Sequence, residues 1–261
     1  EIRKEAIEAR HMPGQAAEFR IKRLNRRSSA ARAWLRLDRW LACSGAVELE
    51  ELLGAECYGG LDIANTTDLA SLRLVWRVED ELLTWGRRWV PAGAVKQRTE
   101  RGTVPYAGWV EAGLLEVTEG DVIDYAVIER AIDEAVERFT IKELAYDPWN
   151  ATDLVNRIIA KKTVTMVPFR QGAKSYHPAM QALERHYVMG RLRHGGDQVL
   201  TWCMSNLVPR FDGPNMNIAP DRQRSADKID DAIALLMAIG RLTAGDGEGG
   251  SVYDTRGVLS L

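Results

Sequence analysis

The fold is decided by the stretch Tyr58-Gly59-Gly60-Leu61-Asp62-Ile63-Ala64, which we interpret as a β-strand carrying one carboxylate near its end. Two further β-rich runs follow, at residues 69–78 and 82–90, with short polar segments between them. Runs of this length separated by turn signals predict an antiparallel three-stranded meander. Asp62 lies near the end of the first run, and the ends of strands are positions where a fold exposes side chains instead of burying them.

Helices and strands alternate further along the chain. We predict a helix at 123–139, a strand at 142–146, a helix at 151–161 and a strand at 163–168. Three antiparallel strands followed by α-β-α-β is the element order of the α/β ribonuclease H-like fold, whose central mixed sheet carries helices on both faces. The fourth strand lies beside the first in that fold.

This topology predicts that two acidic residues far apart in the sequence meet. Asp147, in Ala145-Tyr146-Asp147-Pro148-Trp149, ends the fourth strand and would lie beside Asp62. We expect Trp149 to pack under the site and to fix the Asp147 carboxylate. Clustered carboxylates are the oxygen ligands that Mg²⁺ and Mn²⁺ prefer, so the cluster indicates metal-dependent phosphodiester chemistry.

A third acidic pair, Asp230-Asp231, opens an apolar helix that we expect to be buried against the sheet. One aspartate suffices to cap a helix, so a second is free for another role. Asp230 shares a helical face with Ile233 and Met237, which favours Asp230 as the residue that points toward Asp62. Both aspartates remain candidate metal ligands and catalytic residues.

Composition sets limits on the class of protein. The 261 residues are 46% apolar with a net charge of −2, which suits one sizeable domain and excludes a polycationic DNA-binding protein. An acidic site offsets nearby basic charge in this total, so DNA binding is not excluded. The three cysteines form no Cys-x-x-Cys pair, and no apolar run approaches the roughly 20 residues that span a bilayer. We expect an intracellular protein without a membrane segment.

The domain organisation follows from these patterns. We predict a helical linker segment at residues 1–54, a ribonuclease H-like domain at 55–242 and a flexible tail at 243–261. A hairpin at 207–220 would lie beside the active site. The chain begins at Glu1 without a methionine, so we expect a piece of a longer protein.

Four motifs together resemble a known family, the nuclease domain of the large subunit of tailed-bacteriophage terminases, which are DNA-packaging motors. The motifs are Gly60-Leu61-Asp62-Ile63-Ala64-Asn65-Thr66-Thr67-Asp68, Tyr146-Asp147-Pro148-Trp149-Asn150, His194-Gly195-Gly196-Asp197 and Lys228-Ile229-Asp230-Asp231. In the family's usual Lys-Ile-Asp-Gly form the functional aspartate matches Asp230, whereas Asp231 replaces the glycine.

The resemblance implies an endonuclease that cuts concatemeric viral double-stranded DNA during genome packaging, in the cytoplasm of the host cell. Asp62, Asp147 and the carboxyl-terminal aspartate would hold two divalent cations, Mg²⁺ or Mn²⁺. The full-length protein would also contain an ATPase domain and would work with a portal and a small terminase subunit. This chain has no Gly-x-x-x-x-Gly-Lys-Ser/Thr loop, so we expect the ATPase domain to be absent from it.

Two cations about 3.5–4 Å apart would share Asp62, one activating a water and the other stabilising the leaving 3′ oxygen. The polar segment around Arg170 and Lys174 is the first candidate for contacts with the DNA backbone, and Arg191 and Arg193 are the next. Two alternatives stay open. One is a DNA- or portal-docking module without catalysis, and the other is a different ribonuclease H-like nuclease such as a transposase or resolvase.

Overall fold

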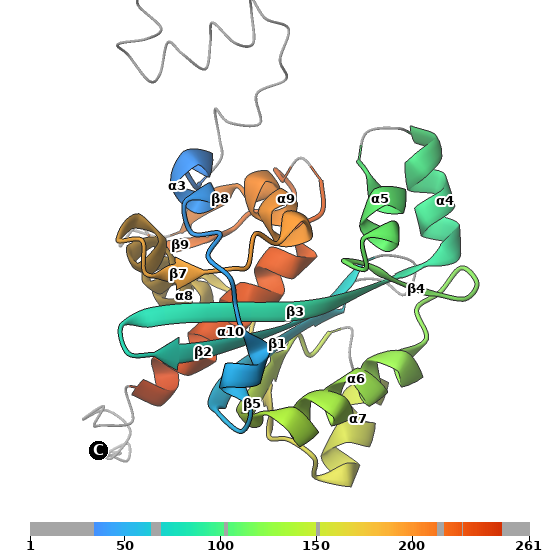
Figure 1. The fold of residues 1–261 in the computed structure, drawn as a ribbon, viewed down its shortest axis with the longest axis horizontal. Coiled ribbons are helices and arrows are strands. Elements are labelled where there is room, and N and C mark those ends of the chain that lie inside the picture. The colour runs from blue at the N-terminus through green and yellow to red at the C-terminus, as the bar shows by residue number, and fades with distance from the viewer. Residues whose placement is uncertain are drawn as a thin grey trace, which may run out of the picture.

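The structure is a computed structural model that describes residues 34–63, 69–101, 104–149, 152–212, 217–225 and 227–246. Its centre is a mixed sheet in the order β4-β3-β2-β1-β5-β6, with β7 also paired to β3 (Figure 1). The strands of this sheet are β1 (Glu56–Ile63), β2 (Ala70–Val78), β3 (Glu81–Pro91), β4 (Glu116–Thr118), β5 (Thr140–Tyr146), β6 (Met166–Pro168) and β7 (Leu192–Arg193).

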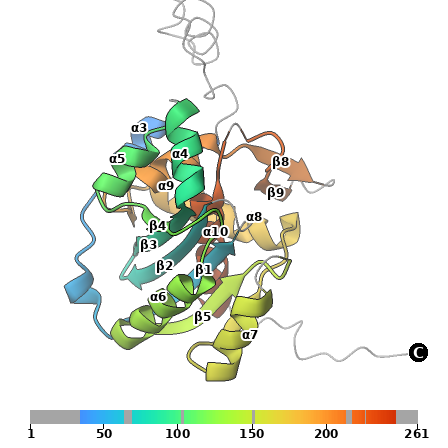
Figure 2. The ribbon, with the colours of Figure 1, turned by 90° about the vertical axis from the view of Figure 1, so that its right-hand side faces the viewer.

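Helices cover both faces of this sheet (Figures 1 and 2). Two of them, α6 (Tyr125–Arg138) and α7 (Thr152–Lys161), pack on one face. The other face is covered by α8 (Ala173–Val188), α9 (Gln198–Asn206) and α10 (Asp230–Asp246). The remaining elements are α3 (Leu37–Leu41), the 3₁₀ helix η2 (Leu49–Leu52), α4 (Ala92–Arg101), α5 (Tyr106–Glu111), and the paired strands β8 (Pro209–Asp212) and β9 (Asn217–Pro220).

The predicted ribonuclease H-like order is confirmed. The strands β1, β2 and β3 form the antiparallel meander, and α6-β5-α7-β6 follows with β5 parallel to β1. The predicted hairpin is present as the antiparallel pair of β8 and β9, which lies beside α8 in Figure 2. The helices α4, α5, α8 and α9 occupy stretches in which we predicted no element.

Several predictions concern the two ends of the chain. The helical linker segment predicted at residues 1–54 lies partly outside the described residues, and within them its α-helix is the short α3. Trp40 and Cys43, in the predicted linker segment, are buried in the main core, and the Trp40 indole donates to Thr201 Oγ1 at 3.0 Å. Helix α10 continues to Asp246, and the rest of the predicted tail lies outside the described residues.

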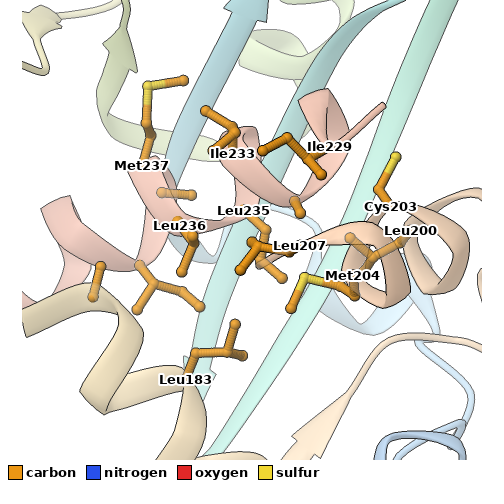
Figure 3. Close-up of a cluster of buried hydrophobic side chains, with 14 of the residues drawn as sticks. Leu183, Leu200, Cys203, Met204, Leu207, Ile229, Ile233, Leu235, Leu236 and Met237 are labelled. Atoms are coloured by element: carbon orange, nitrogen blue, oxygen red, sulfur yellow. The ribbon is translucent and has the colours of Figure 1, made fainter. Parts of the chain in front are cut away.

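The main core lies between the sheet and helices α8, α9 and α10 (Figure 3). Figure 3 shows Leu235 and Leu236 of α10 on the side of the helix that faces Leu183 of α8 and Met204 of α9. Because apolar side chains on nearly every side of α10 are fully buried, the helix is held between the sheet and the outer helices, as its composition predicts. None of the helices in the described ranges has the length and apolar character needed to cross a bilayer.

Gly60 lets α10 lie directly on β1. A Cβ at this position would collide with the backbone of Ala234 and Ala238, whereas Gly245 near the end of α10 lies against Tyr58. The helix therefore runs antiparallel to β1, and its amino end reaches the carboxyl end of that strand. This contact brings the first and third acidic features of the sequence, Asp62 and Asp230, to the same place.

Candidate active site

Asp62 and Asp147 end two neighbouring parallel strands. Leu61 of β1 pairs with Tyr146 of β5, so the two aspartates are the next residues at the same level of the sheet. Both are buried, with 1% and 8% of their surface exposed. The structure thus brings together the two carboxylates that the predicted strand order places side by side.

Asp230 reaches the same point from the helix. Gly60 contacts Ala234, and Asp62 lies two residues further along the same strand face. Asp230 lies four residues before Ala234, one helical turn back on the same side of α10. Two residues along a strand and one turn of a helix cover similar distances, and both lead from the Gly60–Ala234 contact toward the carboxyl end of β1. The carboxylates of Asp62 and Asp230 are therefore neighbours.

The ionisation of these carboxylates reflects burial and mutual repulsion. Burial raises the pKa of Asp62 to about 6, and the negative charge of Asp147 adds to this increase. Burial likewise raises the pKa of Asp230 to about 7, and the charge of Asp62 adds to it. Arg222 and Lys228 oppose both pKa increases, because positive charges favour the ionised form.

Arg222 contacts these carboxylates, although the sequence did not suggest it as a site residue. Its guanidinium donates from Nη2 to both oxygens of Asp62, at 3.1 and 3.0 Å. Its Nη1 lies 3.8 Å from Oδ1 of Asp230. Arg222 follows the β8–β9 pair and belongs to no recognised motif, so no local signal connected it with a residue 160 positions away.

The donor set suits a hard cation. Oδ2 of Asp230 is buried and has no hydrogen-bond partner among the described residues, which leaves a carboxylate oxygen free to coordinate. A positive group already lies between Asp62 and Asp230, where a cation would balance their charge. Within the described ranges, no three carboxylate, imidazole or thiol side chains converge closely enough to hold an ion in the present arrangement.

Asp231 belongs to a different cluster. It is fully buried and accepts from Nε of Arg73 at 2.8 Å, from Nη2 of Arg73 at 2.6 Å and from Nε of Arg88 at 2.7 Å. Asp197 also accepts from both arginines, while its other oxygen caps the amino end of α9 through the Leu200 amide at 3.0 Å. Asp231 is thus turned toward β2 and β3, away from Asp62.

A glycine makes room for this cluster. Arg73 of β2 lies between Gly60 of β1 and Gly86 of β3, and a Cβ at Gly86 would strike the Arg73 side chain. An arginine within the apolar run Leu72-Arg73-Leu74 is itself a sequence signal, because a buried charge requires a buried partner. That signal was available in the sequence, but it does not say which aspartate is the partner.

The four candidate DNA-binding residues lie at opposite ends of the sheet. Arg170 and Lys174 are exposed after β6, at the end that carries Asp147. Arg191 and Arg193 lie at the start of β3, level with the amino end of β1, and pair with Asp80 at 3.3 Å and Glu81 at 2.7 Å. The structure therefore groups only Arg170 and Lys174 with the acidic site.

The expected position of Trp149 was wrong. Its side chain is 86% exposed and does not pack under the site. Its backbone amide instead donates to Oδ1 of Asp147 at 3.1 Å, forming a turn that directs the indole to solvent. The Asp147 carboxylate is therefore held by a backbone amide.

The raised pKa values predict how metal-free stability depends on pH. An aspartate whose pKa is higher in the folded than in the unfolded chain binds more protons when folded, so stability falls as pH rises through the interval between the two values. For Asp62 and Asp230 that interval runs from 3.8 to about 6 and about 7. We expect the free energy of unfolding in EDTA to fall by on the order of 3 kcal/mol between pH 5 and pH 7.5.

Urea denaturation at the two pH values measures this change. Asp62→Asn serves as the control, because it removes one of the aspartates whose pKa is raised and should show a smaller pH dependence. Wild-type stability that rises across this pH interval in EDTA, or an Asp62→Asn variant with the same pH dependence as wild type, would contradict the assignment of the raised pKa values.

The fold and the chain's relatives together define its class. A model of the terminase large subunit, endonuclease domain, matches residues 1–246. A terminase large subunit of Enterobacteria phage HK97 is 29% identical over 256 residues, which cover 97% of this chain and 50% of the relative. Protein YmfN of Escherichia coli (strain K12) is 31% identical over 234 residues, which cover 85% of this chain and 51% of that protein.

The crystal structure of the HK97 bacteriophage large terminase has the same fold, with a TM-score of 0.72 and 28% sequence identity over 91% of this chain and 49% of that one. The architecture is thus ribonuclease H-like, as in terminase nucleases. The chain belongs to the terminase large subunit, endonuclease domain, family. It spans about half the length of the curated relatives that it matches.

Proposed function

We propose that this domain is a divalent-cation-dependent endonuclease that cuts concatemeric viral double-stranded DNA during genome packaging. The observation that carries the proposal is that β1, β5 and α10 each place a buried aspartate, Asp62, Asp147 and Asp230, at the same end of the sheet. Membership of the terminase endonuclease family supports the same reaction. Oδ2 of Asp230 also supports the proposal, because a carboxylate oxygen with no hydrogen-bond partner among the described residues is free to coordinate a cation.

Asp62, Asp147 and Asp230 would hold two cations, Mg²⁺ or Mn²⁺. When bound, the cations supply an activated water and stabilisation of the leaving 3′ oxygen. The protein's own groups hold these carboxylates in place. The Trp149 amide holds Asp147, and the β1–α10 contact at Gly60 sets the position of Asp230 relative to Asp62.

Asp231 would act as a positioning residue for Asp230. Its ion pairs with Arg73 and Arg88 fix the first turn of α10 against β2 and β3. Asp230 is the adjacent residue, so its carboxylate keeps a constant direction toward Asp62. Partners behind a ligating group commonly matter for metal affinity in this way.

Arg170 and Lys174 would contact the phosphate backbone, because they are exposed at the end of the sheet that carries Asp147. Arg191 and Arg193 would contact DNA at a point further from the acidic site. In the whole protein we propose an ATPase domain, a portal and a small terminase subunit as partners, with the host cytoplasm as the place of action.

Cleavage of plasmid DNA by the purified chain tests the proposed activity. We expect nicking and linearisation with Mn²⁺ or Mg²⁺, without ATP and with little sequence preference, and complete loss of activity in excess EDTA. Cleavage that persists in EDTA would remove the metal-dependent mechanism. Mn²⁺ binding and DNA binding without any cleavage would favour the non-catalytic docking module instead.

A further inference from the structure

The guanidinium of Arg222 lies where the carboxylate site most needs positive charge. It contacts both oxygens of Asp62 and approaches Asp230 to 3.8 Å. The side chains of Asp62 and Asp230 are 2% and 4% exposed, whereas that of Arg222 is 42% exposed. Arg222 therefore covers the solvent side of two buried anions.

A defined turn presents this arginine. The Asp221 amide donates to the Val208 carbonyl at 2.8 Å, which ties the turn to the start of the β8–β9 pair. Oδ1 of Asp221 accepts from the amides of Gln223 and Arg224, both at 3.1 Å. Because these bonds fix the backbone on both sides of Arg222, its contact with Asp62 is a built feature of the turn.

A divalent cation and this guanidinium need the same oxygen atoms. Both oxygens of Asp62 are already engaged by Nη2 of Arg222, and an ion that coordinates them must displace those hydrogen bonds. Once displaced, the guanidinium is a cation at the mouth of the site without its former partner. Guanidinium groups bind phosphate oxygens through charge-assisted hydrogen bonds that are often bidentate, so a DNA phosphate suits this position.

We propose that Arg222 is an internal counter-cation that exchanges partners, binding Asp62 in the metal-free protein and a DNA phosphate when divalent cations occupy the carboxylates. The inference rests on the proposed function of the same site and adds a residue to it. Its thermodynamic consequence is that metal and DNA favour each other's binding, because DNA gives the displaced arginine a new anion.

Metal affinity without DNA provides the first test. Mn²⁺ binding to wild type, Arg222→Ala and Arg224→Ala is measured by calorimetry at fixed pH. Arg224 is a matched control, because it lies in the same turn, is 69% exposed and forms its ion pair with Asp221, away from Asp62 and Asp230. We expect Arg222→Ala to bind Mn²⁺ more tightly than wild type by on the order of tenfold, and Arg224→Ala to match wild type.

The second test measures the coupling to DNA. Binding of a short fluorescent DNA duplex is compared with and without Ca²⁺, an oxygen-seeking ion used here in place of Mn²⁺ to limit cleavage. Either substitution removes one positive charge and weakens DNA binding in general. We expect the Ca²⁺-induced gain in DNA affinity to be smaller in Arg222→Ala than in wild type or Arg224→Ala.

Thermal unfolding in EDTA shows whether each variant is folded before it is compared. Equal Mn²⁺ affinity for wild type and Arg222→Ala, both folded, would overturn the exchange while leaving the proposed nuclease intact. An unchanged Ca²⁺-induced gain in Arg222→Ala would overturn the phosphate contact. If none of the three proteins bound Mn²⁺, the inference and the proposed function would fail together.

Discussion

Asp62→Asn and Asp147→Asn are each expected to reduce Mn²⁺-dependent DNA cleavage by on the order of 10³-fold while leaving the domain folded. Asparagine keeps the volume of aspartate but removes the negative charge that would bind the cation. The charge stabilisation that a bound metal supplies is worth several kcal/mol, and each 1.36 kcal/mol corresponds to about tenfold in rate. Initial rates of plasmid nicking over a range of Mn²⁺ concentrations measure the effect.

The free energy of unfolding in EDTA should not fall with the Asp62→Asn substitution, although cleavage does. Asp62 is buried and its charge raises the pKa of Asp230, so removing that charge relieves repulsion in the metal-free protein. We therefore expect Asp62→Asn to be at least as stable as wild type in EDTA at pH 7.5. Asp153→Asn is the matched control, because the same change then falls on a carboxylate that is 75% exposed on α7. A folded Asp62→Asn or Asp147→Asn variant with near-normal cleavage would remove that residue from the site.

The sheet and the first two carboxylates could be predicted because they depend on local patterns. Alternating β-rich runs with polar turns define the meander, and the position of Asp147 at the end of a strand follows from the α-β-α-β order. The helices α8 and α9 escaped prediction for a local reason as well. The segment 170–175 is polar, Pro178 lies inside α8, and two glycines with positive φ precede α9.

The rest of the site depends on contacts that no local pattern contains. Arg222 meets Asp62 because the turn after β9 folds over the end of β1, and its neighbours in sequence give no indication of this. The exposed position of Trp149 follows from the bond between its amide and Asp147, which the composition of the motif does not reveal. The position of Arg222 depends on a tertiary contact, and that of Trp149 depends on the direction of the backbone after Asp147.

Asp230→Asn and Asp231→Asn are expected to fail in different ways, although the residues are adjacent. Successive residues on a helix are rotated by about 100°. Asp230 consequently lies against Asp62, whereas Asp231 lies against Arg73 and Arg88. We expect Asp230→Asn to abolish cleavage without loss of stability in EDTA. Asp231→Asn should destabilise the domain by about 3–5 kcal/mol, because two buried guanidinium groups then share one remaining carboxylate, Asp197.

Urea denaturation in EDTA separates these two outcomes, and cleavage is then compared at a temperature where both variants are folded. Asp197→Asn is an informative control. It removes a partner of the same arginines, but its side chain is 13% exposed and water can replace part of the interaction, so the destabilisation should be smaller. If Asp231→Asn left stability unchanged and abolished cleavage, Asp231 would be the metal ligand. The buried arginines would then be holding the catalytic carboxylate, and Asp230 would be the residue that supports it.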